Sequence, residues 1–307
     1  MKNIQFIKYS KLWLTITTTV MIVSIGLVAI LGLKPGIDFT GGSLLEVEFQ
    51  EALPDVNLVR SYLQEGEHKN AVVQATGDRG LLIRTAFLNE EEHQQLVAGL
   101  AEKFGTEKNT VDEKRFETIG SSVSKTLRER AIWAIILVNL GIISYIAYAF
   151  RKVSRPVASW KYGAIAIFAL IHDVLLVMGV FAILGRYVGT EVDIAFVVAL
   201  LTVLGYSVND TIVVFDRVRE NLLHHKADTF GETVNFGLNQ TIMRSINTTL
   251  TTLLPLLALY FIGGETIKNF SLALLIGIAS GAYSSIFIAS PLLAVVERWQ
   301  VRRLAKA

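Results

Sequence analysis

The chain contains no cysteine, and only 18% of its 307 residues are charged. The missing cysteines exclude a small secreted module that is held together by disulfides. Hydrophobic residues make up 52% of the chain, which excludes a disordered protein, because such chains lack the apolar surface needed to fold. The 29 basic and 27 acidic side chains nearly cancel to a net charge of +2. The total charge therefore gives no reason to expect a nucleic acid partner.

Six long segments contain no Lys, Arg or Glu. Each is long enough, at ~1.5 Å of rise per residue, to cross a hydrocarbon layer of roughly 30 Å. They are residues 12–33, 131–150, 162–185, 194–215, 246–263 and 270–296. The sequence therefore predicts an α-helical membrane protein with six transmembrane helices. We expect the first segment to stay as an anchor, because no small-residue cleavage site of a signal peptide follows it.

Lys and Arg are distributed unevenly among the segments that connect these spans. They are frequent before span one, between spans two and three, between spans four and five, and after span six. The two short loops on the other side carry one base each, Arg186 and Lys268. The positive-inside rule therefore predicts that both termini lie in the cytoplasm.

The sequence also predicts how the chain is divided. We expect a cytoplasmic N-terminus and first transmembrane helix (1–33), an external domain (34–130), a five-helix transmembrane bundle (131–296) and a cytoplasmic tail (297–307).

The segment between the first two spans has the composition of a folded, solvated domain, since it holds 17 of the 27 acidic residues. Its pattern predicts the order strand, helix, strand, strand, helix, strand, which is that of a ferredoxin-like α+β domain. The expected strands are 44–49, 71–76, 81–87 and 110–119, and the expected helices are 55–65 and 89–104. The domain has no catalytic motif, which favours a docking module. Glu90, Glu91 and Glu92 suit the first turn of a helix better than a metal site.

Three ionisable residues lie inside the predicted spans. His172 and Asp173 are near the middle of span three, and Asp210 lies about five residues from the cytoplasmic end of span four. A carboxylate at bilayer depth costs about 2.5–3.5 kcal/mol on insertion scales and usually belongs to an ion path, a relay or a charge pair. These side chains must therefore face protein or water.

Arg244 and Thr248 begin span five and lie on one helical face, at a depth similar to that of Asp210. We expect Arg244 to pair with Asp210 and keep it ionised, so that withdrawal of the arginine would favour uptake of a proton. Purely structural roles stay open for these residues as well. Asp210 and Asp173 could accept hydrogen bonds from hydroxyls of neighbouring helices, and His172 could bond a backbone carbonyl. Arg244 could extend its charged end to the membrane–water interface. The small residues of span six are expected to form a packing seam: Gly277, Ser280, Gly281 and Ser284.

Several motifs resemble those of the SecF family of bacterial protein-export membrane proteins. The first is Gly-Ile-Asp-Phe-Thr-Gly-Gly at 36–42, and the others lie at 205–210, 215–221, 240–244 and 248–253. The resemblance covers nearly the whole chain. The first motif is shared with the sister subunit SecD, but SecD has a much longer external region, which favours SecF.

The resemblance implies a function. SecF pairs with SecD in an assembly that is similar to resistance-nodulation-division transporters and works with YajC and the SecYEG channel. The proton-motive force then drives late steps of preprotein translocation in the bacterial cytoplasmic membrane. The resemblance implies lipid contacts, but no cofactor, metal or nucleic acid.

The resemblance also implies two sets of functional residues. The implied proton relay consists of Asp210, Arg244 and Thr248, with His172 and Asp173 as further members. The implied hinge and family motif consists of Gly36, Asp38, Phe39, Thr40, Gly41 and Gly42.

Three other functions are compatible with parts of the pattern. Asp173 and Asp210 lie on adjacent antiparallel spans at depths that differ by ~6 Å, as an intramembrane aspartyl protease would need. The Gly-x-Gly-Asp context of such a protease is missing. A scaffold subunit that carries no ions would not need an acid at bilayer depth. Half of a small-molecule efflux pump should have several external repeats, and only one is predicted.

Overall fold

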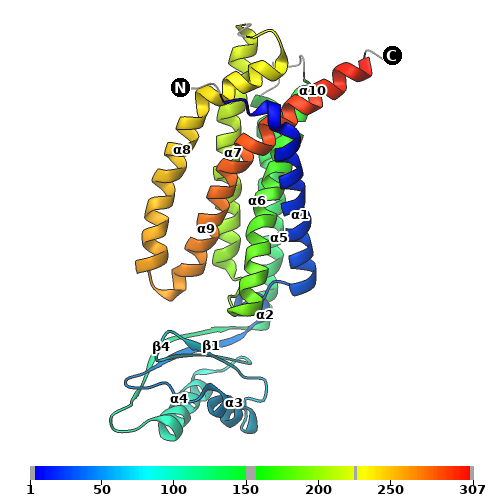
Figure 1. The fold of residues 1–307 in the computed structure, drawn as a ribbon. Coiled ribbons are helices and arrows are strands. Elements are labelled where there is room, and N and C mark those ends of the chain that lie inside the picture. Colours follow the sequence, from blue (N-terminus) through cyan, green and yellow to red (C-terminus); the bar gives the residue numbers. More distant parts are fainter. Residues whose placement is uncertain (1–3, 150–156, 225–226, 305–307) are drawn as a thin grey trace. The chain divides into compact units, whose positions relative to one another are not determined.

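The computed structural model describes residues 4–149, 157–224 and 227–304 and consists of two compact units (Figure 1). One unit combines the N-terminal residues up to Lys34 with the chain from Trp133 onward. The other unit is the segment Pro35–Ile132.

Within the described residues, the structure has six helical segments that are long and apolar enough to cross a membrane, as predicted. The first is α1 (Ser10–Leu31), which follows the short helix η1 (Ile7–Tyr9). The next four are α5 (Ser121–Ala149), α6 (Ser159–Tyr187), α7 (Ile194–Leu223) and α8 (Phe230–Ile262). The sixth is continuous through α9 (Glu265–Ser284), the π-helical turn η2 (Ser285–Ala289) and α10 (Ser290–Leu304). The C-terminal segment that was expected to be a tail is therefore helical as far as Leu304.

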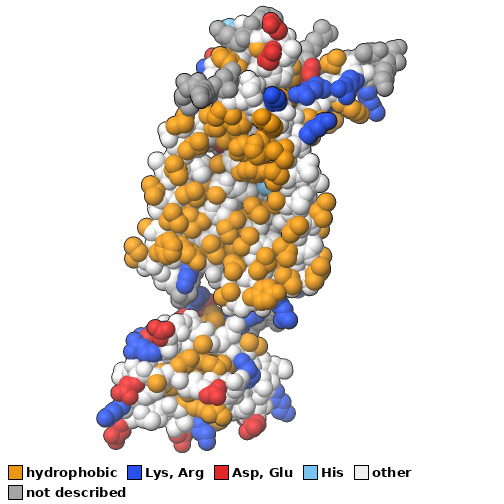
Figure 2. Space-filling model, in the orientation of Figure 1, with side chains coloured by type: hydrophobic (Ala, Val, Ile, Leu, Met, Phe, Trp, Pro, Cys, Tyr) orange, Lys and Arg blue, Asp and Glu red, His pale blue; other side chains and the backbone are white. Residues whose placement is uncertain are grey.

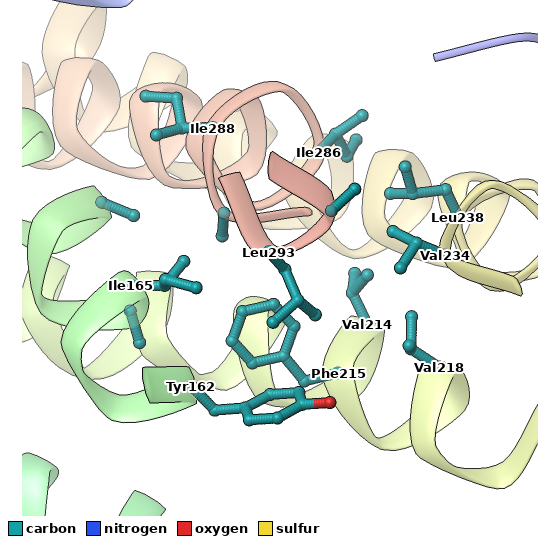
Figure 3. Packing of buried hydrophobic residues seen from close by; sticks show 14 of the residues in the cluster. Tyr162, Ile165, Val214, Phe215, Val218, Val234, Leu238, Ile286, Ile288 and Leu293 are labelled. Carbon is teal, nitrogen blue, oxygen red and sulfur yellow. The ribbon is translucent and has the colours of Figure 1, made fainter. Parts of the chain in front are cut away.

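Helix α7 has a largely buried surface and packs against α6, α8 and α9. Near one end of the bundle, the ring of Tyr162 meets that of Phe215 edge to face, with centroids 5.3 Å apart. Leu293, Val214 and Val218 belong to the same apolar cluster (Figure 3). In lipid, close packing of this kind holds helices together, because burial from water provides little driving force.

Two glycines of α9 allow it to approach α7 closely. A side chain at Gly281 would meet the Cβ of Ser207 at 2.8 Å, and one at Gly277 would overlap the methyl groups of Val203. These glycines therefore form the seam that the sequence predicted. The seam brings the two helices close enough for short polar side chains to bond across them.

We expect Gly277→Ala to destabilise the bundle by about 1–3 kcal/mol, because the stiff Val203 side chain cannot move away cheaply. The matched control is Gly205→Ala on α7, where an added methyl would meet nothing within 4 Å. Thermal unfolding of the detergent-purified protein measures both. Equal melting temperatures for the two variants would contradict the close approach.

The second unit contains the predicted α+β domain. Its strands are β1 (Gly42–Phe49), β2 (Val72–Thr76), β3 (Gly80–Thr85) and β4 (Val111–Ile119), and its two main helices are α3 (Val56–Glu65) and α4 (Glu90–Phe104). The sheet is antiparallel with the order β2-β3-β1-β4. This arrangement confirms the split strand-helix-strand topology.

Local sequence signals determine the elements of this domain. Leu45, Val47 and Phe49 alternate along β1 and are buried in the core. Asp55 caps α3 by accepting a hydrogen bond from the backbone N–H of Asn57 at 2.8 Å. Asn89 and Glu92 form a reciprocal capping box at the start of α4. The acidic run therefore has the helix-starting role that the sequence predicted for it.

The glycine motif lies at the start of the second unit. Residues Ile37–Thr40 form the short helix α2, and Gly41 and Gly42 follow with φ of 75° and 114°. A side chain at Gly42 would meet the carbonyl oxygen of Thr85 at 2.6 Å. The two glycines thus permit a backbone conformation and a close strand approach that other residues would strain.

Candidate functional site

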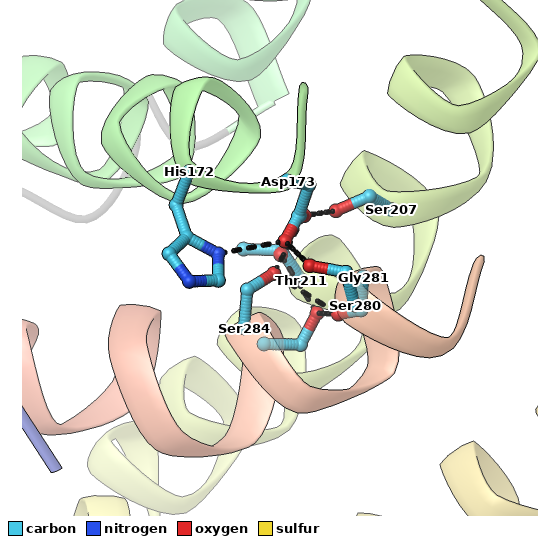
Figure 4. Close-up of polar contacts among 8 residues, drawn as sticks. His172, Asp173, Ser207, Thr211, Ser280, Gly281 and Ser284 are labelled. Atoms are coloured by element: carbon cyan, nitrogen blue, oxygen red, sulfur yellow. Dashed lines mark hydrogen bonds and ion pairs between the residues drawn. The ribbon is translucent and has the colours of Figure 1, made fainter. Parts of the chain in front are cut away.

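The first polar centre of the bundle is Asp173 on α6, whose side chain is completely buried. Three serine hydroxyls donate to its carboxylate (Figure 4). Ser207 of α7 and Ser284 of α9 donate to Oδ2 at 2.6 and 2.7 Å, and Ser280 of α9 donates to Oδ1 at 2.6 Å. The carboxylate thus links three helices and has hydrogen-bond partners on both oxygens.

His172 adjoins this centre. Its Nδ1 lies 3.1 Å from Oδ1 of Asp173, and its ring lies beside that of Tyr283, with centroids 6.1 Å apart. Nε2 is buried and has no hydrogen-bond partner among the described residues. The structure therefore brings the two predicted residues of span three together, and it pairs the imidazole with the neighbouring carboxylate rather than with a backbone carbonyl.

The second polar centre is Asp210 on α7, which is 7% exposed. Ser245 of α8 donates a hydrogen bond of 2.6 Å to its Oδ1. Ser285 of η2 lies beside the carboxylate, but its hydroxyl pairs with Thr211 at 3.0 Å. Oδ2 is buried and accepts no hydrogen bond among the described residues. Asp210 thus differs from Asp173, whose two oxygens both accept hydrogen bonds from serines.

The expected direct contact between Asp210 and Arg244 is absent from the described chain, where the two side chains form no ion pair within 4.0 Å. Arg244 is exposed, and its charge acts on the Asp210 carboxylate only through space. The reason is the helical period: Ser245 and Thr249 lie on the buried stripe of α8, and Arg244 is one residue, or about 100°, away from it. Thr248 shares the exposed face, and its hydroxyl donates to the carbonyl of Arg244 at 2.9 Å.

The two carboxyl groups do not form the hydrogen-bonded dyad that an aspartyl protease needs. Among the described residues, each is bonded to its own hydroxyl groups, Asp173 to serines of α7 and α9 and Asp210 to Ser245 of α8. No hydrogen bond joins the two carboxyl groups to each other in the described chain. The part of the chain that the structure describes also has no group of three or more His, Asp or Glu side chains that could hold a metal ion.

The sequence left open that hydroxyls of neighbouring helices bond the two acids, but it did not indicate which residues supply them. The donors are Ser207, Ser245, Ser280 and Ser284. Ser280 and Ser284 were assigned to the packing seam, although their four-residue spacing puts both on one helical face, as a pair of donors to one carboxylate requires. For Ser245 the only signal is its place beside Arg244.

Six membrane-spanning segments, one extramembrane α+β domain and two buried carboxylates define a multi-spanning membrane protein with polar centres inside its bundle. Residues 100–299 match the family described as protein export membrane protein SecD/SecF, C-terminal, and residues 26–52 match the SecD/SecF GG motif. The chain belongs to the SecD/SecF family, within its SecF branch of protein translocase subunits.

Individual relatives agree with this assignment. A protein translocase subunit SecF from Thermobaculum terrenum is 48% identical over 274 residues, which is 85% of this chain and 84% of the relative. A SecF from Anaerolinea thermophila is 39% identical and covers 96% of this chain and 94% of its own length. The crystal structure of SecDF from Thermus thermophilus matches with a TM-score of 0.82 at 34% identity. That match covers 96% of this chain but 39% of the SecDF chain, so this chain spans about two fifths of that protein.

Proposed function

We propose that this chain is the SecF subunit of a SecDF complex, which uses the proton-motive force to drive late steps of preprotein translocation through the Sec channel. The observation that carries the proposal is the environment of Asp210. It is a buried acid inside a membrane span, bonded through one oxygen to Ser245 and free at the other. An acid in this setting usually belongs to an ion or proton path.

Arg244 supplies the charge that responds to this acid. In the proposed cycle, ionised Asp210 attracts the guanidinium of Arg244, and a proton on Asp210 removes that attraction. The two helices α7 and α8 then shift relative to each other. One charge that moves through 100 mV of membrane potential releases about 2.3 kcal/mol, which is enough to bias an equilibrium between two arrangements of modest energy difference.

SecD is the proposed partner, and α8 offers a surface for it. Arg244, Asn247, Thr248 and Thr251 are all exposed in the isolated chain, although they lie within or next to a membrane-spanning segment. Polar side chains at this depth usually face protein or water rather than lipid. We infer that this polar row of α8 lies against SecD, which would complete the surroundings of Asp210 and Arg244.

The proposed location is the bacterial cytoplasmic membrane, with both termini in the cytoplasm. Lys and Arg are frequent in the connections on the side of the termini and rare in the two short opposite loops, which supports this orientation. The α+β domain then lies on the outer side, where it meets the emerging preprotein. SecYEG and YajC are the further proposed partners.

Motion of the bundle is proposed to reach the α+β domain through the chain around Pro35 and Gly36, where the two compact units join. Gly41 and Gly42 belong to the same motif. Their positive φ angles supply the backbone turn at the base of β1.

A scaffold that carries no ions remains the second candidate. The serine-bonded Asp173 is the observation that favours it, since a fully bonded carboxylate is suited to holding helices together.

The test compares export into membrane vesicles that contain or lack this chain and its partner. We expect the chain to increase release of the translocated preprotein, and an uncoupler that abolishes the proton gradient to remove that increase. The control is the basal, nucleotide-driven translocation in vesicles without the chain, which should respond less to the uncoupler. An increase that persists after uncoupling would favour the scaffold.

A further inference from the structure

A groove of about 670 Å³ runs between α1 and α10, at the end of the bundle where α1 begins. Its charged residues are Lys11, Arg298 and Arg302, and no acid is among the described residues that line it. All three bases are exposed, and their side chains form no hydrogen bond or ion pair with the described residues. Figure 2 shows Lys and Arg side chains gathered along the projecting part of α10, next to the hydrophobic surface of the bundle.

The rest of the groove is compatible with a hydrocarbon chain. Leu14 and Val295 line it with apolar groups, together with the threonines Thr15, Thr18 and Thr19 of α1. The hydroxyls of these threonines donate to backbone carbonyls one turn earlier in the same helix, at 2.8–3.0 Å. Their hydrogen-bond donors are therefore used within α1, and they do not require a polar ligand.

The groove also has the position of a lipid site. Lys11 stands at the boundary of the first apolar span, and Thr19 lies eight residues deeper, or ~12 Å along the helix. Trp299 lines the same groove, is 53% exposed and has Arg303 over its ring at 3.9 Å. Exposed tryptophan beside basic residues is typical of the level of lipid headgroups.

We propose that this groove binds one anionic phospholipid of the surrounding bilayer. Lys11, Arg298 and Arg302 bind the phosphate-bearing headgroup, and one acyl chain lies along Leu14, Thr18 and Val295. Basic pockets between transmembrane helices select anionic lipids in this way. A neighbouring cavity shares Arg298 and Arg302 with the groove and also contains Lys8, but Asp228, Glu232 and Glu297 line it too and offset these positive charges, so it suits an anion less well. The bound lipid would link the first and last transmembrane segments at their common end.

The test uses the full-length protein, purified in mild detergent together with the subunits that copurify with it. Native mass spectrometry then measures retention of phosphatidylglycerol and of phosphatidylcholine across a titration. We expect clear preference for phosphatidylglycerol, and we expect R298Q/R302Q to weaken that binding by roughly tenfold to thirtyfold. The control R186Q/K125Q removes two exposed positive charges outside the groove and should bind phosphatidylglycerol as the parent does.

Two further arms separate the lipid from other occupants. Thr18 is exposed in the part of the groove where the acyl chain is proposed to lie. Thr18→Trp fills that part without a change of charge, and it should reduce phosphatidylglycerol binding as well. Inorganic phosphate in excess should not displace the lipid, since it lacks the acyl contact. Four outcomes would each overturn the proposal. They are equal retention of the two lipids, an R298Q/R302Q protein that binds like the parent, displacement by phosphate, and loss of the lipid when the partner subunit is bound.

Discussion

Asp210→Asn is expected to abolish the proton-dependent part of export and to leave the protein folded and bound to its partner. Asparagine has nearly the same shape, and its side-chain oxygen can still accept the 2.6 Å hydrogen bond from Ser245. It has no ionisable group, so it can neither take up a proton nor attract Arg244 with a negative charge. Export in the vesicle assay should therefore fall to the level measured without the chain.

The matched control is Asp216→Asn, six residues further along α7. The Asp216 side chain is 64% exposed and pairs with Arg219 on the surface, so its replacement should leave export unchanged. Infrared difference spectra provide a direct readout, because a carboxyl signal that changes during turnover should be missing from Asp210→Asn. Normal proton-dependent export by that variant would exclude Asp210 as the proton carrier.

Asp173→Ala is expected to lower the stability of the whole bundle by about 2–5 kcal/mol. The substitution removes three short hydrogen bonds from Ser207, Ser280 and Ser284 and the contact with His172. Interhelical hydrogen bonds in membranes contribute about 0.6–1.7 kcal/mol each, and alanine also leaves a small cavity between α6, α7 and α9. The melting temperature of the detergent-purified protein should fall by roughly 5–15 °C.

Smaller substitutions at the same centre check that the effect comes from the hydrogen bonds. Ser280→Ala removes one donor and should cost about 1 kcal/mol, whereas Asp216→Ala on the exposed part of α7 should cost little. An Asp173→Ala protein that melts like the parent would show that the serine cluster does not hold the helices together. Its activity in export would then identify any separate role in proton transfer.

The α+β domain was predictable because its signals are local. The alternation of Leu45, Val47 and Phe49 gives a strand with one buried face, and the caps at Asp55 and Asn89 give the helix starts within one residue. The turn between β2 and β3 was indicated by Gly77 and Gly80. Each of these signals depends on residues that are close in sequence, so no knowledge of the tertiary structure was needed.

The partner of Asp210 was not predictable in the same way. The sequence put Arg244 and Thr248 on one face of α8, and that face exists, but it is the exposed one. The period of a helix determines which residues share a stripe, whereas the rotation of the helix in the bundle determines which stripe faces inward. That rotation depends on packing against α7 and α9, and it puts Ser245 against the acid.

By itself, the sequence determined the six membrane-spanning segments, the topology of the α+β domain and the positions of the ionisable residues along those segments, because length, charge and short-range periodicity fix these features. Only the tertiary structure decided which hydroxyls bond which carboxylate. Ser207, Ser280 and Ser284 come from two helices that meet Asp173 on a third. Such contacts depend on the distance between the helices and on the rotation of each helix about its axis. The close approach at Gly277 and Gly281 sets the distance between α7 and α9, and no local sequence pattern encodes it.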